Sequence, residues 1–315
     1  MGKVKLQQEL FMKQEVDVSA KIAVIGAGKW GIALHIALSV NNEVLITSRT
    51  KRDIKNFVSL EDALKCEYLI IAIPAQSIRS WLENNFVYTN QKVLVAAKGI
   101  EENSGAFLKE IYEPFVPSSN LGFISGPSFA AEVIQGLPTA LVLNSTSKDF
   151  YDQFYKFFPP FIKTYYSSDV IGAEVAGAYK NVIAIASGIC NGLKLGNNAS
   201  ASLISRGLVE MQRFANHFGA TQSETFTGLS GAGDLFLTAT STMSRNFRVG
   251  LGLANNKSLD EILEELGEVA EGVKTANAIE MLSKKHNIYT PIATEVSLIL
   301  KGKDVKQSLK DLLAN

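Results

Sequence analysis

The chain has 315 residues, 46% of them hydrophobic and 20% charged, a composition typical of a soluble globular protein with room for more than one domain. Its 31 basic and 31 acidic side chains balance, so no global field favours nucleic acid or an anionic membrane as a partner. The two cysteines, Cys66 and Cys190, suit neither a disulfide framework nor a metal site, and no apolar run approaches the ~20 residues that cross a bilayer, so we expect a cytoplasmic protein without metal or membrane insertion.

Short apolar strands separated by helical stretches begin at residue 21. The pattern predicts strands at 21–26, 43–47, 68–73, 93–97, 122–125 and 139–143. A helix is predicted over 30–40. Strands at this spacing, with helices between them, predict a doubly wound parallel sheet covered on both faces. Residues 1–19 lack a sustained apolar core and a cleavage pattern, so we expect an extension and not a signal peptide.

The second half of the chain is predicted to be helical, because the strand pattern ceases after residue 143. Apolar and amphipathic stretches predict helices at 172–189, 202–218, 259–266, 273–286 and 291–301. The sequence therefore predicts an α/β domain at 1–165 and an all-helical domain at 166–315.

A glycine-rich turn follows the first predicted strand. Gly26-Ala27-Gly28-Lys29-Trp30-Gly31 matches the G-x-G-x-x-G pattern of dinucleotide-binding sites. Gly26 permits the tight turn, Gly28 lets a pyrophosphate approach the backbone, and Gly31 lets the helix pack closely on the strand. The alternative is a purely structural glycine turn. The strand before the motif and the helix after it favour a Rossmann-type dinucleotide site.

The end of the second strand bears on the choice of cofactor. An NAD site normally has an acidic residue about 20 residues after the glycines, which accepts from the ribose 2′-hydroxyl. This chain has instead Ser48, Arg49, Thr50, Lys51 and Arg52. A hydroxyl group and several cations suit a 2′-phosphate, so NADP(H) is favoured and NAD(H) is the alternative cofactor. A solvated basic loop would also explain these residues.

Lys180 stands out because it lies inside an apolar predicted helix. Its neighbours include Ala176, Val182 and Ile183, and Asn181 follows it directly. A lysine that snorkels to the surface is the ordinary explanation. A desolvated lysine would instead have a pKa lowered into the range useful for proton transfer, and Lys98 at the end of a strand would lower that pKa further.

Arg245 is the second candidate for ligand binding in the helical half. With Ser244 and Asn246 it forms a cluster of hydrogen-bond donors in a predicted turn, which suits a phosphate group. An ordinary arginine at a helix end is the alternative.

Several short motifs, taken in their order, resemble a known family. They are Gly-Ala-Gly-Lys-Trp-Gly from Gly26, Ala-Lys-Gly-Ile-Glu from Ala97, Gly-Pro-Ser-Phe-Ala from Gly126, Lys-Asn at Lys180, Gly-Ala-Gly-Asp up to Asp234, and Arg-Asn at Arg245. The set is similar to that of the NAD(P)-dependent glycerol-3-phosphate dehydrogenases in their soluble bacterial form. The similarity runs from about residue 21 to the C-terminus.

The resemblance implies a reaction and a set of site residues. The reaction would be the reversible, NAD(P)H-dependent reduction of dihydroxyacetone phosphate to sn-glycerol 3-phosphate, which supplies phospholipid synthesis, in a homodimer. The implied catalytic residues are Lys180, the proton donor and acceptor, with Lys98 and Asp234. The implied further substrate contacts are Gly126, Ser128, Ser244, Arg245 and Asn246. The implied further cofactor contacts are Lys29, Trp30, Arg49, Arg52, Lys98, Ala130, Arg245, Val269 and Glu271.

Two other functions remain open at this point. A dehydrogenase of the same two-domain plan could act on a β-hydroxyacid, although the Arg245 cluster argues against it. A non-catalytic NADP-binding sensor would keep the glycine turn, but such a protein would be expected to lose Lys180 or Asp234.

Overall fold

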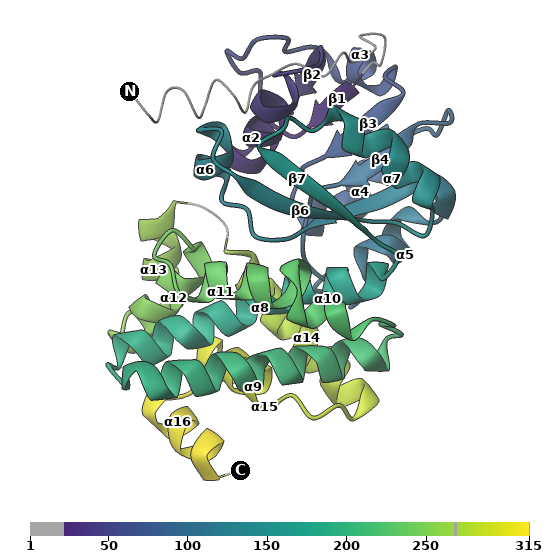
Figure 1. Cartoon of the computed structure of the whole chain (residues 1–315). Helices are drawn as coiled ribbons and strands as arrows, with labels where there is room; N and C mark the ends of the chain where they lie inside the picture. Colours follow the sequence, from purple (N-terminus) through teal and green to yellow (C-terminus); the bar gives the residue numbers. More distant parts are fainter. Residues whose placement is uncertain (1–21, 268–269, 315) are drawn as a thin grey trace. The chain divides into compact units, whose positions relative to one another are not determined.

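The computed structural model describes residues 22–267 and 270–314 (Figure 1). The chain separates into two compact units. The first, here called the α/β unit, comprises residues 22–97 and 109–170. The second, the helical unit, comprises Lys98–Leu108 and the described residues from Ile171 onward.

The α/β unit is built on one sheet of seven strands in the order β2-β1-β3-β4-β5-β6-β7. Their bounds are β1 (Ile22–Ile25), β2 (Val44–Thr47), β3 (Tyr68–Ile71), β4 (Lys92–Val95), β5 (Leu121–Ser125), β6 (Thr139–Asn144) and β7 (Ile162–Ser167). Neighbouring strands are parallel except for β5 and β6, which are antiparallel. All residues of β1 and β3 are buried, as in sheets covered on both faces. The predicted Rossmann-type sheet is therefore confirmed.

Two features of the sheet differ from the prediction. β7 was not predicted; its Ile162 and Thr164 are buried while Lys163 and Tyr165 are exposed, which is the alternation of a strand at the edge of a sheet. The antiparallel pairing of β5 and β6 was not predicted either. Side-chain alternation is the same in both strand directions, so the sequence pattern could not distinguish them.

The helices of this unit contribute the rest of its core. They are α2 (Lys29–Leu38), α3 (Leu60–Leu64), α4 (Ile78–Asn85), α5 (Leu108–Tyr112), α6 (Ala130–Ile134) and α7 (Lys148–Phe154). α2 and α6 pack against each other. One hydrophobic cluster joins Leu34 of α2, Val133 of α6 and Phe154 of α7 to strand residues such as Val24 and Ile70.

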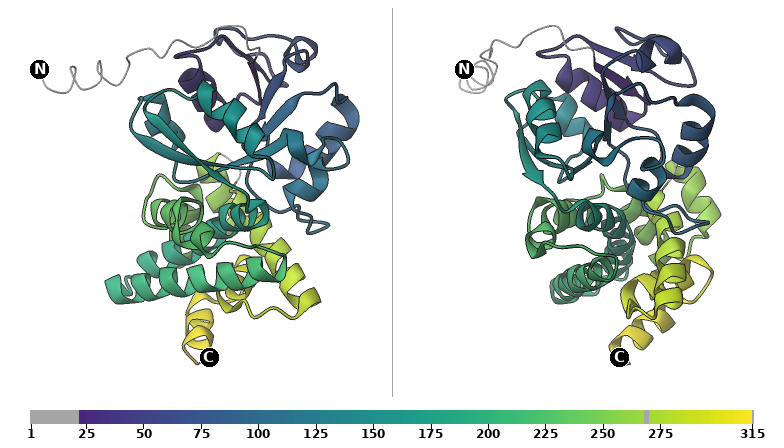
Figure 2. Two further views of the ribbon diagram at one scale, coloured as in Figure 1. Left: turned by 45° about the vertical axis from the view of Figure 1, so that its right-hand side comes forward. Right: turned by 90° about the vertical axis from the view of Figure 1, so that its right-hand side faces the viewer.

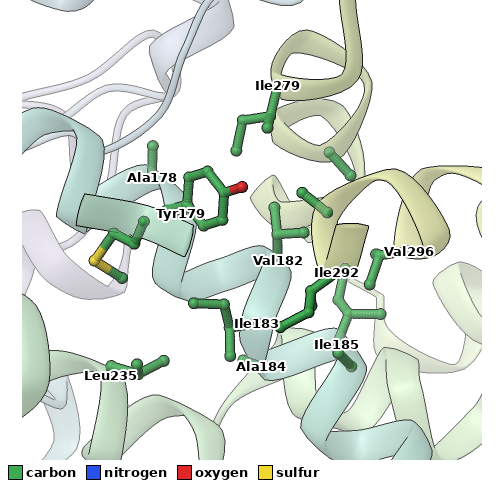
Figure 3. Packing of buried hydrophobic residues seen from close by; sticks show 14 of the residues in the cluster. Ala178, Tyr179, Val182, Ile183, Ala184, Ile185, Leu235, Ile279, Ile292 and Val296 are labelled. Atoms are coloured by element: carbon green, nitrogen blue, oxygen red, sulfur yellow. The ribbon is translucent and has the colours of Figure 1, made fainter. Parts of the chain in front are cut away.

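The helical unit is organised around one buried helix, α8 (Val170–Gly192), in which every residue from 172 to 190 is buried. The others are α9 (Gly196–His217), α10 (Ser223–Thr227), α11 (Asp234–Ala239), α12 (Arg245–Ala254), α13 (Leu259–Leu266), α14 (Glu271–His286), α15 (Pro291–Leu300) and α16 (Val305–Ala314), with a π-helical turn η4 (Leu229–Gly233) before α11. This core includes Val182 and Ile183 of α8, Ile279 of α14 and Ile292 of α15 (Figures 1 and 3).

The five predicted helices correspond to α8, α9, α13, α14 and α15. The short helices α10 and α11, as well as α12 and α16, were not predicted. Within the described residues, no helix is both long and apolar enough to span a bilayer.

The segment Lys98–Leu108 leaves the sheet after β4 and packs with the helical unit (Figure 2). Ile100 and Phe107 form an antiparallel bridge, and both side chains belong to the core of that unit. The compact units and the predicted domains thus differ in this segment. The predicted boundary after residue 165 also differs from the boundary of the units after Val170, because residue 165 lies within β7.

Candidate active site

The glycine turn after β1 is shaped by close backbone approaches. Gly26 has φ +114°, and a Cβ there would lie 2.4 Å from the carbonyl oxygen of Ala72. A Cβ on Gly31 would lie 1.8 Å from the carbonyl oxygen of Gly26. A Cβ on Gly28, in contrast, would meet nothing within 4 Å. Gly26 and Gly31 therefore serve the packing of the chain itself, whereas Gly28 faces open space.

The N-terminus of α2 lies at this glycine turn. Gly28 is its N-cap and offers no side-chain acceptor, and the first turn has no acidic residue. The amide groups of this turn are thus suited to an anion, which the helix dipole also favours. Lys29 and Trp30 begin the helix, and Trp30 packs against the core of the unit. These features fit the pyrophosphate of a dinucleotide.

The basic stretch predicted to select the cofactor lies beside this turn. The amide of Gly26 donates to the carbonyl oxygen of Thr47 at 2.9 Å, so the residues after β2 begin next to the glycines. Arg49 and Arg52 are exposed, and the Ser48 hydroxyl donates to the carbonyl oxygen of Thr50 at 2.7 Å. The position suits the ribose end of a dinucleotide.

The residues after β5 also belong to the α/β unit. Gly126 has φ +106°, a conformation that favours glycine, and the Ser128 hydroxyl donates to its carbonyl oxygen at 3.3 Å. Ala130 begins α6 and packs against the same hydrophobic cluster as Trp30. Within this unit the residues expected to contact the cofactor therefore lie at the start of α2, after β2 and at the start of α6, and α2 packs against α6.

In the helical unit, one carboxylate joins two lysines that are far apart in sequence. Lys180 Nζ donates to Asp234 Oδ1 at 2.5 Å, and Lys98 Nζ donates to Asp234 Oδ2 at 2.6 Å. The exposed fractions of these side chains are 10% for Lys180, 17% for Lys98 and 1% for Asp234. A surface ion pair would be worth little, but here three charged groups are withdrawn from water in one place.

The turn η4 sets the position of Asp234. A Cβ on Gly231 would lie 2.3 Å from the carbonyl oxygen of Phe226, so only glycine allows the chain to turn so closely. Asp234 then begins α11. Thr238, one helical turn later, accepts from Lys180 Nζ at 3.1 Å and donates to the carbonyl oxygen of Asp234 at 2.7 Å. Thr238 was not among the predicted site residues, although its position four residues after Asp234 places it on the same helix face.

The charges of this group determine its protonation. Burial lowers the pKa of Lys180 to about 8, with a further lowering by the positive charge of Lys98 and an opposing effect of Asp234. Burial would raise the pKa of Asp234, but the two lysines outweigh it and hold that pKa below its usual range. Lys180 can therefore both give and take a proton near neutral pH, next to a carboxylate that stays ionised.

Arg245 lies at the start of a helix, and the turn predicted for this cluster was wrong. Ser244 is the N-cap of α12, its hydroxyl accepts from the amide of Phe247 at 3.3 Å, and Arg245 is the first helical residue. A cation at a helix N-terminus is opposed by the helix dipole, so the exposed Arg245 gains nothing from the dipole of α12. The carboxamide oxygen of Asn246 accepts from the amide of Gly272 at 3.0 Å, which leaves its NH2 end as the donor for a ligand.

Glu271 lies close enough to Arg245 and to the lysine pair for their charges to act on its carboxyl group. It begins α14; burial raises the pKa of its carboxyl group, against the opposing positive charges of Arg245, Lys180 and Lys98. The structure thus brings together within the helical unit five of the predicted site residues: Lys98, Lys180, Asp234, Arg245 and Glu271. Val269 lies outside the described residues. In the described ranges there is no group of three or more His, Cys, Asp and Glu residues arranged for a metal.

A glycine turn at the start of a helix in a parallel sheet, together with a buried lysine pair on one carboxylate, is typical of a dinucleotide-dependent dehydrogenase. Comparison with known proteins gives the particular family. Residues 40–151 match the family profile described as NAD-dependent glycerol-3-phosphate dehydrogenase N-terminus, and residues 169–310 match its C-terminal counterpart. The chain belongs to the NAD-dependent glycerol-3-phosphate dehydrogenase family.

Individual relatives agree with this assignment. The chain is 64% identical to a glycerol-3-phosphate dehydrogenase [NAD(P)+] from Sulfurimonas denitrificans, over 94% of this chain and 100% of the relative. It is 60% identical to a protein of the same name from Campylobacter jejuni strain RM1221, over 93% of this chain and 98% of the relative. A crystal structure of glycerol-3-phosphate dehydrogenase from Coxiella burnetii is similar, with 31% identity, a TM-score of 0.85, and coverage of 94% of this chain and 99% of that one.

Proposed function

We propose that this chain catalyses the reversible, NAD(P)H-dependent reduction of dihydroxyacetone phosphate to sn-glycerol 3-phosphate. The observation that carries the proposal is the lysine pair on Asp234, because a ketone reductase needs a cation and a proton donor for the carbonyl oxygen. The names of the relatives point to the same substrate and to NAD(P)+ as the cofactor.

In this proposal the two predicted domains bind different ligands. The Rossmann-type domain at 1–165 would hold the dinucleotide through the turn Gly26–Gly31, the start of α6 and the basic stretch after β2. The helical domain at 166–315 would bind the substrate. Gly126 and Ser128 would contribute to the substrate contacts from the first domain.

Lys180 has the central chemical role in this proposal. When bound, the nicotinamide supplies the hydride for the carbonyl carbon. In its ammonium form, Lys180 donates a proton to the carbonyl oxygen of the substrate; in the opposite direction its neutral amine removes the proton from the hydroxyl group. Asp234 holds Lys180 Nζ and Lys98 Nζ in position, and Lys98 adds positive charge beside the developing oxyanion.

The start of α12 supplies the phosphate site. Arg245 offers a guanidinium fork that matches phosphate oxygens, Asn246 offers its NH2 group, and Ser244 fixes the helix start by capping it. Glu271 and Arg245 also match cofactor contacts of the family.

Arg245→Ala is expected to raise the KM for dihydroxyacetone phosphate by roughly 10- to 100-fold, the loss typical of one hydrogen-bonded charged contact. Steady-state kinetics at saturating NADPH measure this effect. Arg248→Ala is the matched control, since Arg248 is also exposed on α12 but lies outside the predicted cluster. An unchanged KM in Arg245→Ala would remove Arg245 from the phosphate site.

The double variant Arg49→Ala/Arg52→Ala is expected to raise the KM for NADPH by roughly 10-fold or more and to leave that for NADH nearly unchanged. The reason is that NADPH alone carries the 2′-phosphate, whose charge the two guanidinium groups would meet. Lys55→Ala, in the same exposed stretch, is the control for loss of a positive charge. Equal losses with both cofactors would contradict the proposed preference for NADP(H).

One assay tests the proposed function as a whole. NADPH absorbance is followed with and without dihydroxyacetone phosphate, and in parallel with β-ketoacid substrates. Decay that depends on dihydroxyacetone phosphate is expected. Its absence from a folded, NADPH-binding protein would support a sensor, and a preference for a ketoacid would support the other dehydrogenase.

We further propose that the protein is a cytoplasmic homodimer and that its product supplies phospholipid synthesis. Light scattering would test the dimer. Growth of a deletion strain on glycerol 3-phosphate would test the supply of phospholipid synthesis.

A further inference from the structure

Lys98 begins the segment Lys98–Leu108, which belongs to the helical unit and determines where Lys98 lies. Ile100 and Phe107 are buried in its core, at 0% and 3% exposure, and bridge to each other. The amide of Glu101 donates to the carbonyl oxygen of Ala106 at 3.0 Å. These contacts hold the backbone beside Lys98 in place, so the position of its ammonium group depends on the path of its side chain.

The side chain of Lys98 runs over Gly177 of α8. A Cβ built on Gly177 would lie 3.3 Å from Lys98 Cδ, 3.4 Å from Cγ and 3.6 Å from Cβ. The first distance is tighter than ordinary van der Waals contact, and the second lies at its lower limit. A methyl group at position 177 would therefore need the hydrocarbon part of Lys98 to shift by a few tenths of an ångström, and a larger side chain would press on it more strongly.

The backbone does not need glycine at this position. Gly177 lies inside α8, without a left-handed φ. A glycine in a helix interior is less stable than alanine, because it loses more conformational freedom on folding. Lys180 follows three residues later, so the glycine and the catalytic lysine share one side of the helix.

We infer that Gly177 is a positioning residue: its missing side chain lets Lys98 pass over α8 and reach Asp234 beside Lys180. This inference rests on the proposed function, in which Lys98 stabilises the developing charge. The inference gives Gly177 itself no contact with substrate or cofactor. It acts through Lys98 by leaving a path for it.

The test is a series at position 177 in the full-length protein. Gly177→Val, whose branched side chain presses much harder on the Lys98 stem, should lower kcat/KM for dihydroxyacetone phosphate by about 100-fold, the effect of a displacement of about 1 Å. Gly177→Ala, whose Cβ needs the stem to shift by only a few tenths of an ångström, should lower it by about 2- to 3-fold. The melting temperature of Gly177→Ala should be equal to or above that of the parent, because alanine stabilises the helix. A structural role for the glycine would instead lower stability and activity together.

The pH profile gives a second readout. The charge of Lys98 lowers the pKa of Lys180, so a displaced Lys98 should move the limb of the kcat/KM profile near pH 8 to higher pH. The charged groups around Lys180 in this comparison are Lys98, Asp234 and Glu271. Gly207→Ala on α9 is the control, because its methyl group would press on Ile183 of α8 and not on a lysine. This variant should leave the pH profile unchanged.

Lys98→Ala separates this inference from the proposed function. In the Lys98→Ala background, Gly177→Ala should have no further effect on kcat/KM, since no stem remains to be displaced. If Lys98→Ala retains parent activity, the proposed role of Lys98 is wrong. If Lys98→Ala is impaired while Gly177→Val keeps the parent kcat/KM and pH profile, the role of Lys98 stands and the inference about Gly177 is overturned.

Discussion

Replacing Lys180 with methionine is expected to lower kcat by ~100-fold or more, the effect typical of removing a general acid or base. The variant should fold, because methionine matches the shape of a lysine stem in the buried core of α8. Asp234 would also keep an ionic partner, since Lys98 Nζ lies 2.6 Å from its Oδ2. NADPH binding, measured by fluorescence titration, should stay near that of the parent.

Lys180→Arg sharpens this test. Arginine keeps the positive charge but does not release its proton in proteins, so a role limited to charge would be rescued and a role in proton transfer would not. We expect no rescue. Lys285→Met on the exposed end of α14 controls for the loss of a lysine. Turnover close to that of the parent in Lys180→Met would show that the lysine is structural.

The parts of the fold that the sequence predicted correctly are those in which neighbouring residues determine the outcome. The turn Gly26–Gly31 could be predicted because its residue spacing follows directly from a strand, a tight turn and a helix start. The central strands could be predicted because burial on both faces makes them continuously apolar. β7 was missed because Lys163 and Tyr165 interrupt its apolar residues on the exposed side.

Contacts between distant residues could not be derived in the same way. The apolar neighbours of Lys180 indicated its burial, but nothing in its surroundings indicated Asp234, which lies 54 positions away. Lys98 is 136 positions from Asp234, and it belongs to a segment that packs with the other unit. The resemblance to a family supplied these residues, whereas the structure supplied their distances and their protonation.

The start of α12 shows a different limit. Ser244, Arg245 and Asn246 were predicted as a cluster of donors, but in a turn. A serine followed by a helix of ten residues is an ordinary N-cap, and the ambiguity arose because α12 has two glycines that weaken its helical pattern. The helix adds its own amide groups to the predicted phosphate site, so the correction strengthens the argument for an anion there.

Asp234→Asn is expected to impair both the chemistry and the stability of the helical unit. The amide has no charge, so Lys180 and Lys98 would lose the carboxylate that both of them bind, at a position where that carboxylate is only 1% exposed. One of the two lysines would also face the NH2 group of asparagine, which is a donor. Removing one partner of a buried ion pair costs about 3 kcal/mol or more in the free energy of unfolding. Urea denaturation at neutral pH measures this loss, and Asp260→Asn at an exposed position is the control.

The pH dependence of the same variant identifies the lysine that is affected. Reduction needs the ammonium form of Lys180, so kcat/KM of the parent should fall as the pH rises through about 8, and the oxidation rate should rise there. Asp234 raises the pKa of Lys180 by favouring its charged form, so its removal lowers that pKa. Both limbs should therefore move to lower pH in Asp234→Asn, together with a fall in kcat of roughly 100-fold, since the proton donor is no longer held in position. A limb that stays near pH 8 would show that it belongs to a group other than the Lys180–Asp234 pair, and the assignment of Lys180 as the proton donor would have to be abandoned.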